Sequence, residues 1–100
     1  MDENDIHEII KAFSDAAKRA VKVGFKVIEI HSAHGYLMHS FLSPLANKRN
    51  DSYGGDIHGR MRLLLEVVDA VRSVIPEDMP LFCRISAVDG IENGWEIEDS

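Results

Sequence analysis

Two histidines three residues apart, closely followed by a tyrosine, are the residues of this sequence best suited to chemistry. His31, His34 and Tyr36 follow the largely apolar segment Val27–Ile30. That segment predicts a strand, and α/β proteins build their sites at the carboxyl ends of parallel strands. Two N–H donors and one O–H donor suit a substrate oxygen that gains negative charge. The sequence therefore predicts a catalytic site at this strand end.

Two other interpretations of the histidine pair stay open at this point. The imidazoles could cap nearby backbone carbonyls, and Tyr36 could be a packed aromatic side chain, which would make all three structural. A metal site would need three or four ligands, so His39, His58 or Asp51 would have to converge with the pair.

Length, composition and charge limit the classes of protein to which the chain can belong. The chain has 100 residues, 45% of them hydrophobic, which suits one small domain with a packed core. The net charge of −6 argues against nucleic acid or an anionic membrane as the main partner. No apolar run reaches the length of about 18 residues that a membrane-spanning helix needs. The acidic start is unlike a signal peptide, so a cytoplasmic location is expected.

Cys83 is the one cysteine of the chain. A single thiol excludes an intramolecular disulfide and any metal site that needs several cysteines. Because it lies in an apolar run, we expect it to be a buried core thiol.

Hydrophobic spacing predicts two long helices and two strands. The first helix is expected to be capped by Asp5 with Glu8 and to stop at Gly24. A long loop follows the first strand, and loops of that size are usually functional. In order, the predicted segments are a helix over Ile6–Val23, a strand over Phe25–His31, a loop over His31–Gly59 with a short helix near Leu37–Leu42, a helix over Arg60–Ile75, a strand over Leu81–Ser86 and an acidic, turn-rich tail over Val88–Ser100.

A strand–helix–strand order of this length favours parallel strands joined by a right-handed crossover, which indicates an α/β fold. Two strands cannot close a barrel and would leave unpaired edges. The chain is therefore expected either to belong to a larger fold or to associate with other copies of itself.

Alternation along the strands assigns their faces. Ile28 and Ile30, and on the other strand Leu81, Cys83 and Ile85, form apolar faces that helices should cover. Glu29 and Arg84 are the charged residues on the opposite, mixed faces. A buried carboxylate without a partner is costly, so we expect these two side chains to interact.

Several ordered motifs give the chain a resemblance to a known family. It resembles the old yellow enzyme family of flavin-dependent ene-reductases across nearly all of residues 1–100. The motifs are His31-Ser32-Ala33-His34-Gly35-Tyr36-Leu37, Phe41-Leu42-Ser43-Pro44, Asn47-Lys48-Arg49, Asp51-Ser52-Tyr53-Gly54-Gly55, Arg84-Ile85-Ser86 and Gly94-Trp95. The chain departs from the family where His58-Gly59-Arg60 replaces a common Glu-Asn-Arg.

The resemblance implies a (β/α)8 TIM barrel that binds FMN, of which residues 1–100 would form a partial segment around the fourth and fifth strands. It implies that His31 and His34 bind the carbonyl oxygen of an enone, that Tyr36 supplies a proton, and that Arg84 lies near the flavin ring. NADPH or NADH would be the reductant. The alternative is a truncated, non-catalytic fragment that does not bind FMN alone and is stabilised by self-association as a homo-oligomer.

Overall fold

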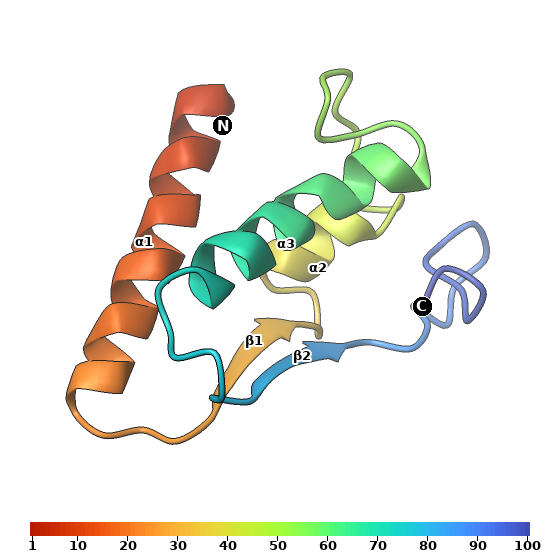
Figure 1. Ribbon diagram of the computed structural model, residues 1–100. Coiled ribbons are helices and arrows are strands. Elements are labelled where there is room, and N and C mark those ends of the chain that lie inside the picture. The colour runs from red at the N-terminus through yellow and green to blue at the C-terminus, as the bar shows by residue number, and fades with distance from the viewer. The chain divides into compact units, whose positions relative to one another are not determined.

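The computed structural model describes all 100 residues. Its elements follow the predicted α/β order, and β1 and β2 lie side by side as parallel strands of a two-stranded sheet (Figure 1). The chain divides into two compact units, residues 1–30 with 65–82 and residues 31–64 with 83–100. The elements are α1 (Glu3–Lys22), β1 (Ile28–Ser32), α2 (Leu37–Leu42), α3 (Ile57–Arg72) and β2 (Leu81–Ile85).

Helix α1 begins earlier than hydrophobic spacing predicts because Asp2 caps it. The Asp2 carboxylate accepts the Asp5 backbone N–H at 2.9 Å, and the Asp5 carboxylate accepts the Asp2 backbone N–H at 2.9 Å. These reciprocal bonds form a capping box. The predicted cap at Asp5 with Glu8 is therefore wrong, since Asp5 already lies inside the helix.

The predicted stop of α1 at Gly24 is confirmed. Gly24 has a φ of +100°, a region that residues with a side chain rarely adopt. Its N–H donates to the Val21 carbonyl, and the Phe25 N–H donates to the Ala20 carbonyl. This pair of bonds is a Schellman motif, which satisfies carbonyls left free at the helix end.

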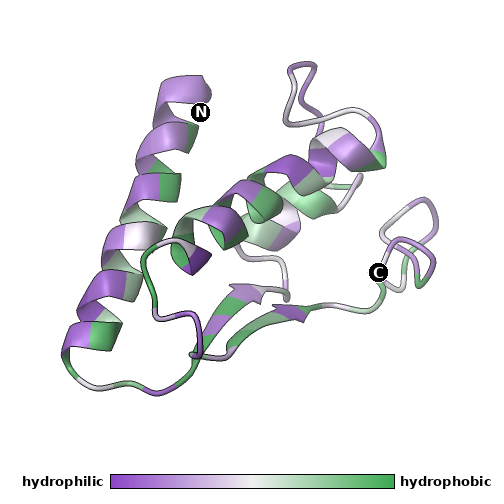
Figure 2. Cartoon of the chain, in the orientation of Figure 1, coloured by the Kyte–Doolittle hydropathy of each residue, from purple (hydrophilic) through white to green (hydrophobic).

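The core of the first unit comes from the apolar face of α1 and the last turns of α3. Figure 2 shows α1 as a mostly hydrophilic helix in which hydrophobic stretches recur from turn to turn. That pattern is typical of a helix that buries one side only. The buried apolar side chains of this unit are Ile6, Ala17, Ile30, Val67, Val71 and Ile75. No helix of the chain combines the length and apolarity needed to cross a bilayer.

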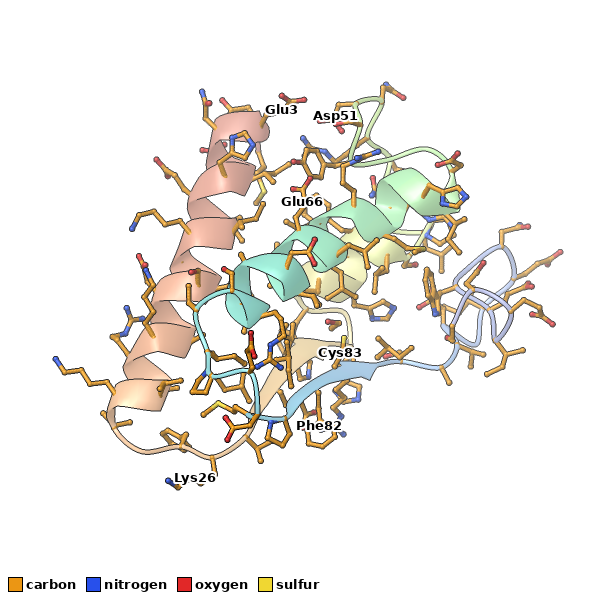
Figure 3. The ribbon with its side chains drawn as sticks, in the orientation of Figure 1. Glu3, Lys26, Asp51, Glu66, Phe82 and Cys83 are labelled. Atoms are coloured by element: carbon orange, nitrogen blue, oxygen red, sulfur yellow. The ribbon has the colours of Figure 1, made fainter.

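The apolar face of β2 is not covered by a helix, although the sequence predicts that it is. Ile30 of β1 is buried as expected, but Cys83, labelled in Figure 3, is exposed, so the prediction of a buried core thiol is wrong. Ile85 is also exposed. The physical reason is that no helix follows β2 within these 100 residues, so the outer face of this strand has no cover.

Glu29 and Arg84 are both exposed, and neither takes part in an ion pair. The predicted pairing rested on burial of Glu29, and that burial is not found. Each charge is left to solvent, where an ion pair would contribute little.

Helix α3 begins at Ile57, and the backbone of its residue Gly59 lies very close to the backbone of Gly54. The Asp56 carboxylate accepts the Gly59 N–H at 2.9 Å. A Cβ built on Gly59 would lie 2.0 Å from the Gly54 carbonyl oxygen. A side chain at this position would therefore force the backbone to shift.

Replacing Gly59 by alanine is expected to destabilise the chain by about 1–3 kcal/mol, because the backbone must shift to admit the new methyl group. In an unconstrained helix the same change would stabilise by about 0.5–1 kcal/mol. Urea denaturation followed by circular dichroism measures the sign. Gly24→Ala is the comparison, since its Cβ would meet no atom within 4 Å and only the positive φ opposes it. A more stable Gly59→Ala chain would contradict the close approach.

Candidate functional site

The three predicted site residues come together in the second unit. His31 lies in β1, and His34 and Tyr36 lie in the turn between β1 and α2. The ring centroids of His31 and His34 are 5.3 Å apart. Those of His31 and Tyr36 are 5.5 Å apart, with the rings edge to face. The sequence prediction that these rings gather is confirmed, while their catalytic roles stay predictions.

All three side chains are exposed, and their polar atoms are free. Tyr36 is 69% exposed. The ring nitrogens of His31 and His34 and the Tyr36 hydroxyl make no hydrogen bond to any other group of the chain. The alternative that the imidazoles cap backbone carbonyls is therefore wrong. The donors remain available to a ligand.

The turn that carries His34 has an unusual backbone. His34 has a φ of 61° and Gly35 a φ of 79°, so two consecutive residues are left-handed. For a residue with a side chain this conformation costs roughly 1–2 kcal/mol, and it persists only where neighbouring groups fix it. The turn is closed by the Tyr36 N–H, which donates to the Ala33 carbonyl at 3.3 Å, and two side chains add further hydrogen bonds. The Ser86 hydroxyl accepts the His34 N–H at 3.0 Å, and Nδ1 of His39 accepts the Gly35 N–H at 2.7 Å.

Behind this turn lies a polar network centred on Asp89. Its carboxylate accepts the Nε2–H of His39 at 2.7 Å, the Ser43 hydroxyl at 2.5 Å and the Trp95 N–H at 2.7 Å. The His39 and Asp89 side chains are only 11% and 8% exposed. Since Nδ1 of His39 accepts from Gly35, the ring proton must sit on Nε2.

The ionisation of Asp89 follows from these contacts. Burial raises the pKa of the carboxyl, but the hydrogen bonds from Ser43, the Trp95 N–H and His39 outweigh it and hold the pKa of Asp89 below its ordinary value. A charged carboxylate at the centre of the network is therefore the stable form at neutral pH.

Sequence reasoning missed this network. It gave His39 no role and did not single out Asp89. The available signals were a histidine inside an otherwise largely apolar short helix and an Asp-Gly pair shortly after the second strand. Both are weak, because the two residues are 50 positions apart and only the fold brings them together.

The loop after α2 is braced by its own polar side chains. The Asn47 amide is buried and donates to the carbonyls of Phe41 and Tyr53 at 2.7 and 2.8 Å. Arg49 pairs with Asp51 at 2.5 Å, and this hydrogen bond lowers the pKa of Asp51. These contacts hold the loop in place through groups of its own segment. No cluster of three or more histidine, cysteine, aspartate or glutamate side chains forms, so the structure gives no support to the metal interpretation.

Arg84 is the candidate cofactor-binding residue. Its side chain is exposed on β2 and makes no hydrogen bond or ion pair within the chain. A free guanidinium is chemically suited to an anionic, planar ring system, so this residue fits the flavin that the resemblance implies.

The chain combines an α/β fold with free imidazole donors at the end of one parallel strand and an unpaired arginine on the next strand. These are features of a flavin-dependent oxidoreductase segment. The sequence model of the NADH:flavin oxidoreductase / NADH oxidase family matches residues 1–100. The chain belongs to this family of oxidoreductases.

Individual relatives agree with this assignment. The chain is 58% identical over 87 residues to an NADPH dehydrogenase of Clostridium acetobutylicum, covering 87% of the chain and 26% of that protein. It is 54% identical over 99 residues to an NADPH dehydrogenase of Geobacillus thermodenitrificans, covering 99% of the chain and 28% of that protein. The chain thus spans about a quarter of the length of these curated relatives.

A solved structure confirms the fold class. A complex of 2-naphthoyl-CoA reductase with 2-naphthoyl-CoA matches with a TM-score of 0.95 and 36% sequence identity, covering 99% of this chain and 15% of that one. The observed helices and parallel strands are therefore those of part of a TIM-barrel reductase fold, as the sequence predicts.

Proposed function

We propose that a protein of the relatives' length carrying this chain is an FMN-dependent ene-reductase that uses NADPH or NADH to reduce the C=C bond of an α,β-unsaturated carbonyl compound. The observation that carries the proposal is the gathering of His31, His34 and Tyr36 with all their polar atoms unbonded. Membership of a flavin oxidoreductase family supports the cofactor.

The residues of this chain have separate tasks in the proposed reaction. Bound FMN, once reduced, supplies the hydride that adds to the β-carbon of the substrate. His31 and His34 donate hydrogen bonds to the substrate carbonyl oxygen, where the addition places negative charge. Fixed donors at that position stabilise the transition state more than the ground state. Tyr36 gives its phenolic proton to the α-carbon, which completes the saturated product.

Arg84 has an electrostatic task in this proposal. Its guanidinium, unpaired within the chain, would contact the flavin ring and stabilise negative charge on the reduced form. The remaining contacts to the cofactor would come from parts of the protein outside these 100 residues, since the relatives are about four times longer.

Flavin binding and turnover test the proposal directly. The full-length protein is expected to quench FMN fluorescence with one equivalent bound and to oxidise NADPH when cyclohexenone is added. The 100-residue chain by itself is expected to bind FMN weakly or not at all. A full-length protein that binds FMN but leaves cyclohexenone unreduced would contradict the ene-reductase assignment, and absence of FMN binding would contradict the cofactor.

A second candidate is a non-catalytic segment that is stabilised by self-association. The observation in its favour is uncovered apolar surface on β2, where Phe82 is 58% and Ile85 39% exposed. A two-stranded sheet with unpaired edges is a template for further strands. Sedimentation of the 100-residue chain separates the candidates, because a stable homo-oligomer without flavin favours the second one.

The net charge of −6 supports the part of the proposal that excludes nucleic acid and anionic membranes as partners. We propose a small enone as the ligand, no nucleic acid or membrane partner, and a cytoplasmic location.

A further inference from the structure

The turn between β1 and α2 has two successive left-handed residues, His34 and Gly35, and is closed by the Tyr36 N–H, which donates to the Ala33 carbonyl at 3.3 Å. That bond leaves the N–H groups of His34 and Gly35 without a backbone acceptor inside the turn. Each of their N–H groups has one acceptor. The acceptor for His34 is the Ser86 hydroxyl beyond β2, and the acceptor for Gly35 is the His39 imidazole.

The acceptor on His39 exists only in one form of the ring. Nδ1 accepts from Gly35 only while the ring proton is on Nε2, and Asp89 selects this tautomer by accepting the Nε2–H at 2.7 Å. Asp89 is fixed in turn by Ser43 and by the Trp95 N–H. The nearly buried Asp89 carboxylate thus orients the His39 imidazole, and the imidazole holds the turn.

We propose that His39, oriented by Asp89, is a positioning residue that holds the Gly35 amide and thereby fixes the turn carrying the candidate donor His34. The imidazole of His39 does not contact the substrate in this scheme. The catalytic consequence rests on the proposed function, because the orientation of His34 matters to the reaction only if His34 binds the substrate oxygen.

Two substitutions separate this role from a merely structural one. His39→Asn keeps an acceptor near the position of Nδ1 but cannot reach Asp89. His39→Gln keeps an N–H near the position of Nε2 for Asp89 but has no acceptor for Gly35. His7→Asn, at an exposed position of α1, is the matched control.

Amide hydrogen exchange of Gly35 in the 100-residue chain, read by NMR, is the first measurement. In His39→Gln the Gly35 amide is expected to exchange about fivefold to tenfold faster than in the unsubstituted chain, since it loses its hydrogen bond. In His39→Asn and in His7→Asn the rate should stay within about twofold. The reverse order of the two His39 variants, or an unprotected Gly35 amide in the unsubstituted chain, would overturn the proposal.

Turnover by the full-length protein links the turn to the reaction. His39→Gln should lower kcat about tenfold or more with a smaller change in KM, and His39→Asn should recover most of the loss. If the amide-exchange result holds and the unsubstituted protein reduces no enone, the proposed function fails while the support of the turn by His39 stands. If the enone is reduced and His39→Gln exchanges at the unsubstituted rate, the positioning role fails alone.

Discussion

Replacing His34 by alanine in the full-length protein is expected to lower kcat/KM for enone reduction about 10²–10³-fold, the usual effect of losing one fixed donor to a developing oxyanion. The reason is that His34 is held in a left-handed conformation with its ring 5.3 Å from that of His31, and the nitrogens of neither ring make a hydrogen bond within the chain. Steady-state oxidation of NADPH with cyclohexenone as acceptor measures the loss.

The two imidazoles are expected to act as a pair. Because they would bind the same oxygen, the double substitution of His31 and His34 should cost less than the product of the two single effects. His7→Ala is the control, since this exposed side chain on α1 should leave the rate unchanged. A loss of less than about threefold in His34→Ala would be far below the effect of a fixed donor and would remove His34 from the reaction.

Replacing Asp89 by alanine is expected to be the most damaging single change to stability. Three donors, on His39, Ser43 and the Trp95 backbone, would lose their acceptor in a nearly buried site. Each unsatisfied buried group typically costs about 1–3 kcal/mol, and removal of one partner from a buried charged pair typically costs about 3–5 kcal/mol. We expect a loss of about 3–5 kcal/mol, because some of the freed donors can turn toward water. Urea denaturation measures it, with Asp69→Asn on the exposed face of α3 as the control.

Lowering the pH should also destabilise the network around Asp89. The pKa of Asp89 is lower in the folded chain than its ordinary value, so its contribution to stability is fully present above the unfolded pKa. That contribution is lost as the pH falls through the folded pKa, when the carboxyl is protonated. The unsubstituted chain should therefore lose more stability than Asp89→Ala between neutral pH and about pH 2–3. Equal losses in the two chains would show that Asp89 is not the group involved.

Local sequence information was sufficient where neighbours in the chain determine the structure. The short helix expected at Leu37–Leu42 has those bounds in the structure. The gathering of His31, His34 and Tyr36 also follows from their closeness in sequence to the end of one strand. The cap of α1 was predicted wrongly, because aspartate side chains of similar capping ability stand at positions 2 and 5 and the reciprocal bonds that make Asp2 the cap are seen only in the structure.

Features that depend on distant segments could not be predicted in the same way. The Asp89–His39 contact joins residues 50 positions apart and has no spacing rule. The exposure of Cys83 depends on whether another segment covers β2, which alternation along a strand does not report. The apolar residues of β2 show which face of the strand is suited to burial, but they carry no information about whether another segment covers that face.

The uncovered thiol on β2 has a practical consequence. Cys83 is the only cysteine of the sequence, so a maleimide dye would attach at one defined point in the middle of that strand. Its Sγ is 3.4 Å from the Ser32 hydroxyl of the adjoining strand, so labelling kinetics would report on the sheet itself. Slower labelling at higher protein concentration would indicate that another polypeptide covers the strand.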